Sequence, residues 1–87
     1  MEKAKKQEII KQFAIKDGDV GSSDVQVAVL TARISELTEH LREHKKDHST
    51  RRGLIALVNR RRKLLSYLAG HDQDRYQSLL QRLNLRH

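Results

Sequence analysis

Apolar residues recur at alternating spacings of three and four along residues 27–41, and this seam constrains the fold more than any other feature of the sequence. Its members are Val27, Leu30, Ile34, Leu37 and Leu41. Such spacings bring side chains onto one face of an α-helix. We therefore expect a helix over residues 24–44. Ser23 and Gln26, three residues apart, have the form of a capping box at its start.

A second long helix is expected from near Thr50 to Ala69. Its apolar stripe comprises Leu54, Leu57, Val58, Leu64, Leu65 and Leu68. Gly70 follows the stripe and has the position of a helix stop. Two long helices with facing seams and a short polar connection predict an antiparallel hairpin.

Shorter helices are expected at both ends of the chain. The first runs from Lys3 to Ile15, and its apolar face consists of Ile9, Ile10 and Phe13. It has little to bury, so it has freedom to move, and its position is left open. Asp72 or Asp74 can cap a last helix. The apolar residues of that helix are Tyr76, Leu79, Leu80 and Leu83.

These elements predict an all-α fold of four helices, with residues 1–87 forming a single helical domain. The chain contains no proline, which favours uninterrupted helices, and no cysteine, which excludes disulfides and thiolate metal sites. A chain of 87 residues buries only roughly 60–65% of the surface that it exposes when unfolded. Helix packing around a thin core must therefore hold the fold together.

Positive charge is concentrated in the second half of the sequence. Residues 1–44 carry seven basic and eight acidic side chains, whereas residues 45–87 carry eleven and three, a net charge of +8. Such a surface suits a polyanion, because lysine and arginine release counterions when they neutralise phosphates. The alternative is a solvated helical surface that happens to be basic.

Polar side chains flank the apolar seam of the first long helix at heptad intervals. Gln26, Arg33 and His40 form one column about 21 Å long, which suits a surface that lies along a groove. The alternative gives each a separate role. Gln26 would then be a capping residue, Arg33 a partner for Glu36, and His40 a solvated edge residue.

Tyr67 lies about 120° from the centre of the apolar stripe of the second long helix. Lys63 and Arg60 precede it by one and two turns on the same side. The ring and hydroxyl of Tyr67 with two cations beside them suit RNA, and the alternative is a tyrosine that covers the last helix. Arg61 falls within the stripe, so we expect a buried stem and a head that reaches solvent or pairs with a carboxylate.

Four more basic residues flank the expected hairpin turn. They are Lys45, Lys46, Arg51 and Arg52. We interpret them as support for a polyanion surface, and the alternative is solvated charge around a turn.

Several classes of function are disfavoured. His40, His44 and His48 are spaced by four, but His44 continues the seam, His48 falls in the turn and no cysteine supports them, so we expect no metal. No activated nucleophile, glycine-rich phosphate loop or deep pocket is expected, and therefore no cofactor and no enzyme. The longest apolar run, residues 54–58, is too short for a signal peptide or membrane span, which predicts a cytoplasmic protein.

Folded RNA is the target that the residues favour. Three aromatic rings, Phe13, Tyr67 and Tyr76, are too few for the stacking platforms that bind single strands. Long central helices disfavour a helix-turn-helix reader of DNA. Two alternatives stay open. A basic protein–protein module would show an exposed apolar patch, and a membrane-surface helix would need the apolar seams that the hairpin uses.

Several segments in order closely resemble bacterial members of the universal S-fifteen family of small-subunit ribosomal proteins. They are Gly18–Ala28, Leu37–Leu41, His44–His48, Arg52–Leu54, Arg60–Leu65 with Tyr67–Leu68, and Arg75–Tyr76. The resemblance covers nearly the whole chain. It implies a four-helix protein, monomeric when free, that binds the central domain of small-subunit ribosomal RNA early in assembly. It also implies contacts with neighbouring ribosomal proteins and with large-subunit RNA at an intersubunit bridge.

The same resemblance implies two RNA-binding surfaces. A junction surface that grips a three-way RNA junction would consist of Gly21, Gln26, Arg33 and Tyr67. A groove surface that reads a minor groove at a G·U and a G·C pair would consist of His40, Asp47 and Thr50. Some family members also bind their own messenger RNA, and the sequence leaves open whether this chain does.

Asp47 is unexpected as an RNA contact in a basic region. A carboxylate can accept from the exocyclic amine of guanine or orient His40, and it can also cap the third helix. Four positions depart from the family pattern. Val20 stands where threonine is usual, Ser49 replaces the second of a usual histidine pair, Thr50 replaces serine, and Gly70 replaces a commonly basic residue. These departures bear on affinity more than on identity.

Overall fold

The computed structural model describes residues 2–16, 18 and 21–85, and within these ranges it contains helices and no strands. The four helices are α1 (Lys3–Phe13), α2 (Ser23–Glu43), α3 (His48–His71) and α4 (Gln73–Leu83). The predicted all-α class and the number of helices are confirmed. No helix in the described part of the chain is long and apolar enough to cross a membrane.

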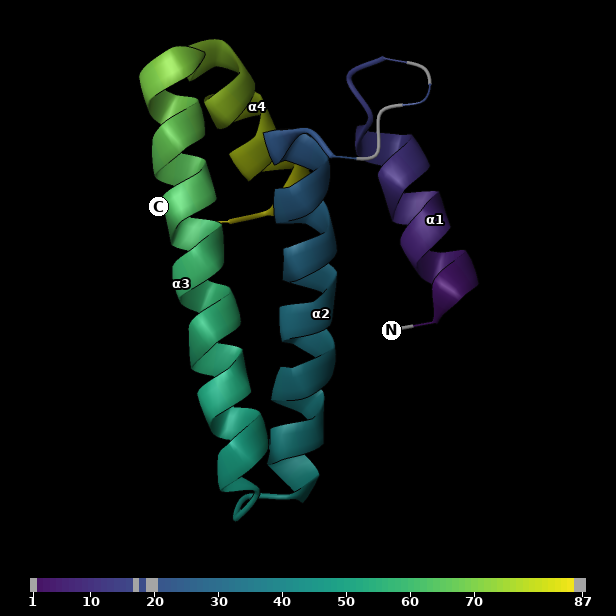
Figure 1. The fold of residues 1–87 in the computed structure, drawn as a ribbon, viewed down its shortest axis with the longest axis vertical. Helices are drawn as coiled ribbons and strands as arrows, with labels where there is room; N and C mark the ends of the chain where they lie inside the picture. The colour runs from purple at the N-terminus through teal and green to yellow at the C-terminus, as the bar shows by residue number, and fades with distance from the viewer. Residues whose placement is uncertain (1, 17, 19–20, 86–87) are drawn as a thin grey trace.

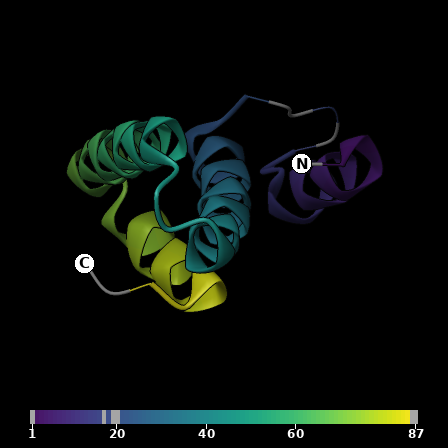
Figure 2. The same ribbon diagram turned by 90° about the horizontal axis from the view of Figure 1, so that it is seen from below.

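Helices α2 and α3 form the predicted antiparallel hairpin, which runs the length of the molecule (Figure 1). Helix α4 folds back over one face of this hairpin, whereas α1 lies beside α2 on the side away from α3 (Figure 2). The structure measures 40 × 28 × 18 Å. The face of the hairpin opposite α4 is therefore left uncovered by any helix.

The start of α2 corrects the predicted capping box. The N-cap is Ser22, whose Oγ accepts from the backbone N–H of Val25 at 3.3 Å. Gln26 donates instead through Nε2 to the carbonyl oxygen of Gly21 at 2.7 Å. Ser22 takes this role because its backbone is extended, as an N-cap residue requires, whereas Ser23 is already helical.

The bounds of α3 were predicted too short at both ends. The helix begins at His48, two residues before Thr50, because Asp47 caps it and accepts from the N–H of Thr50. It continues through Gly70, which is therefore not a stop, and ends at His71. Asp72 leaves the helical conformation and at once caps α4 by accepting from the N–H of Arg75 at 3.1 Å. The polar cap of the next helix, and not a glycine, ends α3.

Helix α1 ends at Phe13, two residues earlier than predicted, because the backbone of Ala14 is extended. Phe13 is buried, and the guanidinium of Arg82 lies 4.1 Å from the centre of its ring. Arg82 also donates through Nη2 to the carbonyl oxygen of Gln12 at 2.7 Å. These contacts join α1 to the end of α4. The mobility expected of α1 stays a prediction.

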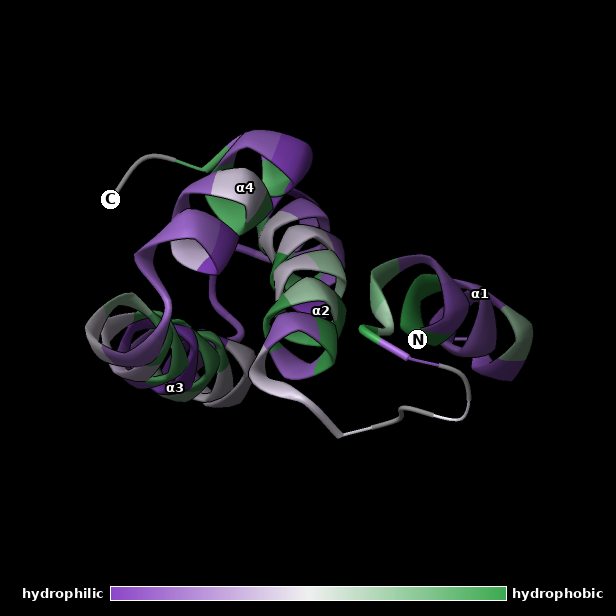
Figure 3. Cartoon of the chain, turned by 90° about the horizontal axis from the view of Figure 1, so that it is seen from above, coloured by the Kyte–Doolittle hydropathy of each residue, from purple (hydrophilic) through white to green (hydrophobic). Residues whose placement is uncertain are grey.

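The core lies at the end of the hairpin where all four helices meet. Seen from above, the hydrophobic faces of α2, α3 and α4 turn toward one another (Figure 3). Asp24 is the buried charged residue among them and forms an ion pair with Arg75. The buried apolar residues are Phe13, Val25, Val27, Ala28, Leu30, Leu65, Leu68, Tyr76 and Leu79.

Arg61 is half-buried, as its place in the apolar stripe predicted. Its Nη1 donates to the hydroxyl of Thr31 at 3.2 Å, so the partner is a neutral hydroxyl and not a carboxylate. Burial lowers the pKa of the Arg61 guanidinium, because a low-dielectric environment disfavours the charged form. Arg61 is thus a structural residue that ties α3 to α2.

Candidate nucleic-acid interface

The three residues of the groove surface form one hydrogen-bonded cluster at the hairpin turn. The Nε2 atom of His40 lies 2.9 Å from Oδ2 of Asp47. Thr50 donates to the same carboxylate twice, through its backbone N–H at 3.1 Å and its hydroxyl at 2.6 Å. Residues from the end of α2, the turn and the start of α3 are thereby brought together.

Asp47 is fixed as a carboxylate by this cluster. The hydroxyl and the N–H of Thr50, followed by the ring of His40, hold the pKa of Asp47 well below its usual range. Because an ionised carboxylate only accepts hydrogen bonds, it fixes the direction of both the Thr50 hydroxyl and the His40 ring. The two roles considered for Asp47, helix cap and orienting group, are performed by the same side chain.

His44 is a member of this region that the sequence assigned wrongly. It was predicted to continue the apolar seam, but it is exposed and follows α2 as its C-cap residue. Its ring stacks on that of His40, with centroids 4.4 Å apart and 27° between the planes. The spacing of four between the two histidines was the signal for this contact. In the described ranges no group of three or more His, Cys, Asp or Glu side chains could hold a metal ion.

The junction surface lies at the opposite end of the hairpin. Gly21 and Gln26 are joined by the hydrogen bond at the start of α2, and Arg33 is exposed two turns further along that helix. Tyr67, on α3, is 58% exposed, and its ring stacks on that of His71 with the ring centroids 4.0 Å apart. More than half of the Tyr67 side chain is therefore open to a partner, which disfavours the alternative in which it covers the last helix.

The supporting basic residues are exposed on both ends of the hairpin. Arg51 bends back over the turn and donates through Nη2 to the carbonyl oxygen of Lys45 at 2.9 Å. Because Tyr67 follows Arg60 by one heptad, both lie on the same side of α3. The exposed members are Lys45, Lys46, Arg51, Arg52, Arg60 and Lys63.

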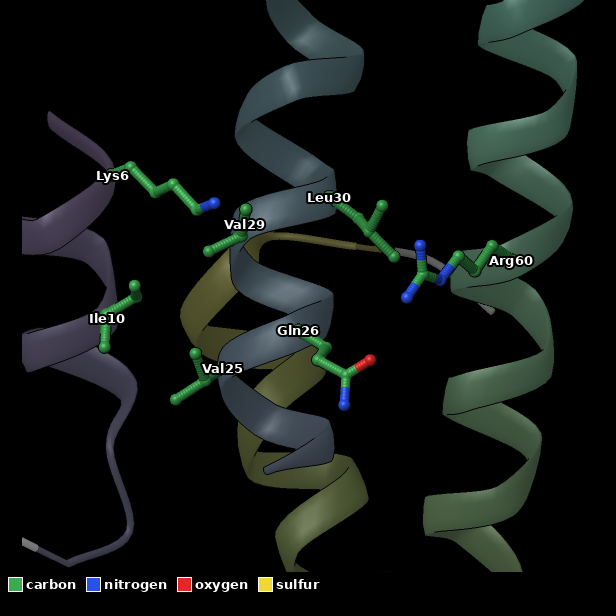
Figure 4. Close-up of a pocket in the computed structure, with 7 residues that line it drawn as sticks. All are labelled: Lys6, Ile10, Val25, Gln26, Val29, Leu30 and Arg60. Carbon is green, nitrogen blue, oxygen red and sulfur yellow. The ribbon is translucent and has the colours of Figure 1, made fainter. Parts of the chain in front are cut away.

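A trough lies on the uncovered face of the hairpin, beside the junction surface (Figure 4). We call it the α2 trough, because α2 supplies its floor while α1 and α3 supply its walls. Its volume is about 230 Å³. Its lining residues are Lys6, Ile10, Val25, Gln26, Val29, Leu30 and Arg60. Lys6 was not among the residues predicted from the sequence, because nothing in the sequence places α1 against α2.

The Val20 departure from the family pattern falls outside the described residues. Ser49 and Gly70 are exposed within α3, and the side chain of Thr50 keeps the hydroxyl that binds Asp47. The serine-to-threonine departure therefore preserves the donor on which the cluster depends.

Comparisons with known proteins identify the family of this chain. The family model described as ribosomal protein S15 matches residues 6–86. A small ribosomal subunit protein uS15 from Micrococcus luteus is 57% identical over 86 residues, covering 99% of this chain and 97% of that protein. Another from Opitutus terrae is 62% identical over 81 residues, covering 93% of this chain and 92% of that protein. These relatives are structural proteins of the ribosome and not enzymes. The chain belongs to the ribosomal protein S15 family of the small ribosomal subunit.

Proposed function

We propose that this chain binds the central domain of small-subunit ribosomal RNA through two surfaces of one helical hairpin. The junction surface, Gly21, Gln26, Arg33 and Tyr67, grips a three-way junction. The groove surface, His40, Asp47 and Thr50, reads the adjacent minor groove. The observation that carries this proposal is the preformed cluster in which Thr50 and His40 both bind the Asp47 carboxylate.

The groove surface has the chemistry that a minor groove requires. In a minor groove, base pairs that contain guanine differ from the others mainly by the amino group of guanine, which donates a hydrogen bond. The carboxylate of Asp47 can accept from that amino group. The ring of His40 and the hydroxyl of Thr50 can reach the 2′-hydroxyls that line the wide minor groove of RNA.

The hairpin connects the two surfaces as a rigid spacer. Gln26, Arg33 and His40 recur at heptad intervals along α2, so they share one side of the helix over about 21 Å. A rigid protein binds one arrangement of flexible RNA arms better than the others and so shifts their population toward it. We infer that the protein acts early in assembly in this way, so that later assembly steps begin from RNA arms whose arrangement is already fixed.

Family resemblance supports the remaining partners. We propose contacts with neighbouring ribosomal proteins and with large-subunit RNA at an intersubunit bridge, and a monomeric state for the free protein. The ribosome, in the cytoplasm, is its place of action. Regulation through its own messenger RNA is a further property of some family members.

Binding of the full chain to a central-domain three-way-junction RNA tests the proposal. The reference is a scrambled RNA of equal length, and affinity is measured across a salt series. Tyr67→Ala and His40→Ala are each expected to weaken junction binding by roughly tenfold, since one good contact is worth about 1–3 kcal/mol. Gln77→Ala, an exposed residue of α4, is the matched control and should leave binding unchanged.

The outcomes separate RNA recognition from its alternatives. Preference for the junction RNA, lost in both variants and falling steeply with salt, supports the proposal. Equal binding to both RNAs would leave a basic helical protein without this specificity. Salt-tolerant binding would favour a protein–protein module.

A further inference from the structure

The α2 trough combines an apolar floor with cationic walls. Its floor is apolar, formed by Val25, Val29 and Leu30 of α2, and its volume is about 230 Å³. Each wall carries a cation. Lys6 reaches from α1 toward Val29, and Arg60 reaches from α3 toward Leu30 (Figure 4).

Gln26 provides a hydrogen-bond acceptor at the edge of the floor. Its Nε2 donates to the carbonyl oxygen of Gly21, which fixes the orientation of the amide. The Oε1 atom then faces the Arg60 side of the trough (Figure 4). The trough thus offers an apolar bed, one directed acceptor and a cation on either side.

We propose that the α2 trough binds a single unpaired nucleotide of the RNA. The base lies against Val29 and Leu30, and its amino group donates to Oε1 of Gln26. Lys6 and Arg60 contact the phosphates on its two sides. This inference rests on the proposed function and deepens it, because it adds a subsite and one new binding residue, Lys6, to the junction surface.

Charge and continuity favour a nucleotide over an apolar peptide. Both side walls are cationic and the chain as a whole carries a net charge of +7, which attracts a polyanion. Gln26 belongs to both the trough and the junction surface, so RNA bound to one lies beside the other. An apolar peptide segment would satisfy the floor and leave both cations without a partner.

An unpaired nucleotide fits better than a paired one. The bases of an intact helix are stacked and cannot reach a floor that lies between two walls. Sequence-specific contacts with RNA instead go to unstacked bases in loops, bulges and junctions, which can be splayed out. A three-way junction supplies such nucleotides.

The inference gives α1 a role in binding. Lys6 reaches the trough only because Ile9, Ile10 and Phe13 pack α1 against the core. The α1 position and RNA binding are then linked, because RNA that contacts Lys6 favours the packed position of α1.

An abasic scan of the junction RNA tests the subsite. Each unpaired nucleotide of the junction is replaced in turn by an abasic one, and affinity for the full chain is measured. Replacement at one position is expected to weaken wild-type binding about tenfold, because the base loses its apolar contact with the floor and its hydrogen bond to Gln26. Val29→Phe fills the trough. This variant should bind intact RNA as weakly as wild type binds that abasic RNA, and removal of the base should then cause no further loss of affinity.

Lys6→Gln supplies a second variant that cannot disturb the core, because Lys6 is exposed. It is expected to reduce affinity several-fold and to lower the slope of affinity against salt by about one phosphate contact. Lys5→Gln is its matched control, since Lys5 is exposed on the same helix about 100° away. The control should keep the wild-type slope.

The results distinguish the subsite from the proposed function. If wild-type protein prefers junction RNA while Val29→Phe and Lys6→Gln both bind like wild type, the subsite is overturned and the junction surface stands. If wild-type protein has no preference for junction RNA, both proposals fail. The subsite is also overturned if abasic replacement at each position weakens binding by Val29→Phe as much as it weakens binding by wild type.

Discussion

The two ends of the hairpin are held in place by different forces. At the end where α1 and α4 pack, apolar side chains such as Val27, Leu68 and Leu79 are almost completely buried. At the turn end, no residue from 31 to 64 is buried, because α2 and α3 are alone there. The polar cluster of His40, Asp47 and Thr50 provides the fixed geometry instead.

This difference determines how each surface presents its functional groups. Tyr67 extends from the part of α3 that packs in the core, so its backbone is rigid while its exposed side chain can adapt to a partner. The groups of the groove surface are held by one another and have a set direction before any partner arrives. We infer that side chains of the junction surface adjust to the RNA that binds. The groove surface instead binds RNA that matches its preset geometry.

Core truncation gives the largest expected difference between the two ends. Leu68→Ala removes a side chain that is 1% exposed and should lower the free energy of unfolding by about 3 kcal/mol. Leu57→Ala, in the half-buried part of α3, should cost about 1 kcal/mol. Urea unfolding followed by circular dichroism measures both.

If Leu68→Ala and Leu57→Ala lowered the free energy of unfolding equally, the comparison would be contradicted. The turn half of the hairpin would then be packed as tightly as the core. Ser66→Ala, exposed on the same helix, is the control and should stay within about 0.5 kcal/mol of wild type.

Asp47 allows the cap and the orienting role to be separated. Asp47→Ala removes both and should destabilise the protein, as loss of an N-cap does. Asp47→Asn keeps a good capping oxygen but loses the charge that binds His40. It should therefore stay near wild-type stability and still weaken binding of the junction RNA.

Chemical unfolding and RNA affinity, measured on both variants, check this prediction. If Asp47→Asn binds RNA as wild type does, the carboxylate serves the helix and not the RNA. If both variants lose stability equally, the geometry of the cap is more demanding than the hydrogen bond to Thr50 suggests.

The sequence predicted most of the hairpin, whereas the groove surface came from the family resemblance and stays a proposal. Periodicity of three and four is a local signal, so it identified α2, α3 and the side of α2 that carries Gln26, Arg33 and His40. Asp47 and Thr50 are also close in sequence, and their pairing follows from capping.

What the sequence did not predict depends on long-range packing or on small differences in local geometry. Lys6 joins the α2 trough because α1 docks on α2, and no local pattern encodes that docking. Ser22 and Ser23 are equally good N-caps by residue type. Their backbone conformations distinguish them, because Ser22 is extended and Ser23 is helical. Gly70 appeared to be a stop, although Asp72 caps α4 and ends α3 there.

Glycine replacements in α3 test whether the two ends unfold together. Gly53 and Gly70 both lie within the helix, and a Cβ at either would meet nothing within 4 Å. Gly53→Ala should raise the free energy of unfolding by about 0.5–1 kcal/mol, and Gly70→Ala, close to the helix end, by less.

Hydrogen exchange locates the benefit of Gly53→Ala. If protection rises for core amides as well as for amides near the turn, the hairpin unfolds as one unit. A gain confined to the amides of the turn half would show that this half opens separately, and the comparison between the ends would then extend to their dynamics.

Acid should weaken the turn end by the smallest amount, since the Asp47 carboxylate is partly exposed and screened by solvent. Its pKa is depressed in the folded protein, so below about pH 4, near the ordinary pKa of aspartate, the unfolded chain binds a proton before the folded one does. The contribution of Asp47 is therefore complete above that pH and decreases as the pH falls. Asp47→Asn cannot titrate at this position, so wild type and this variant should have similar stability from pH 5 upward, and wild type should become less stable than the variant below pH 4. A difference that stays constant to pH 2.5 would mean that Thr50 and His40 do not hold the carboxylate in solution, and the turn end would lose the polar rigidity that distinguishes it from the core.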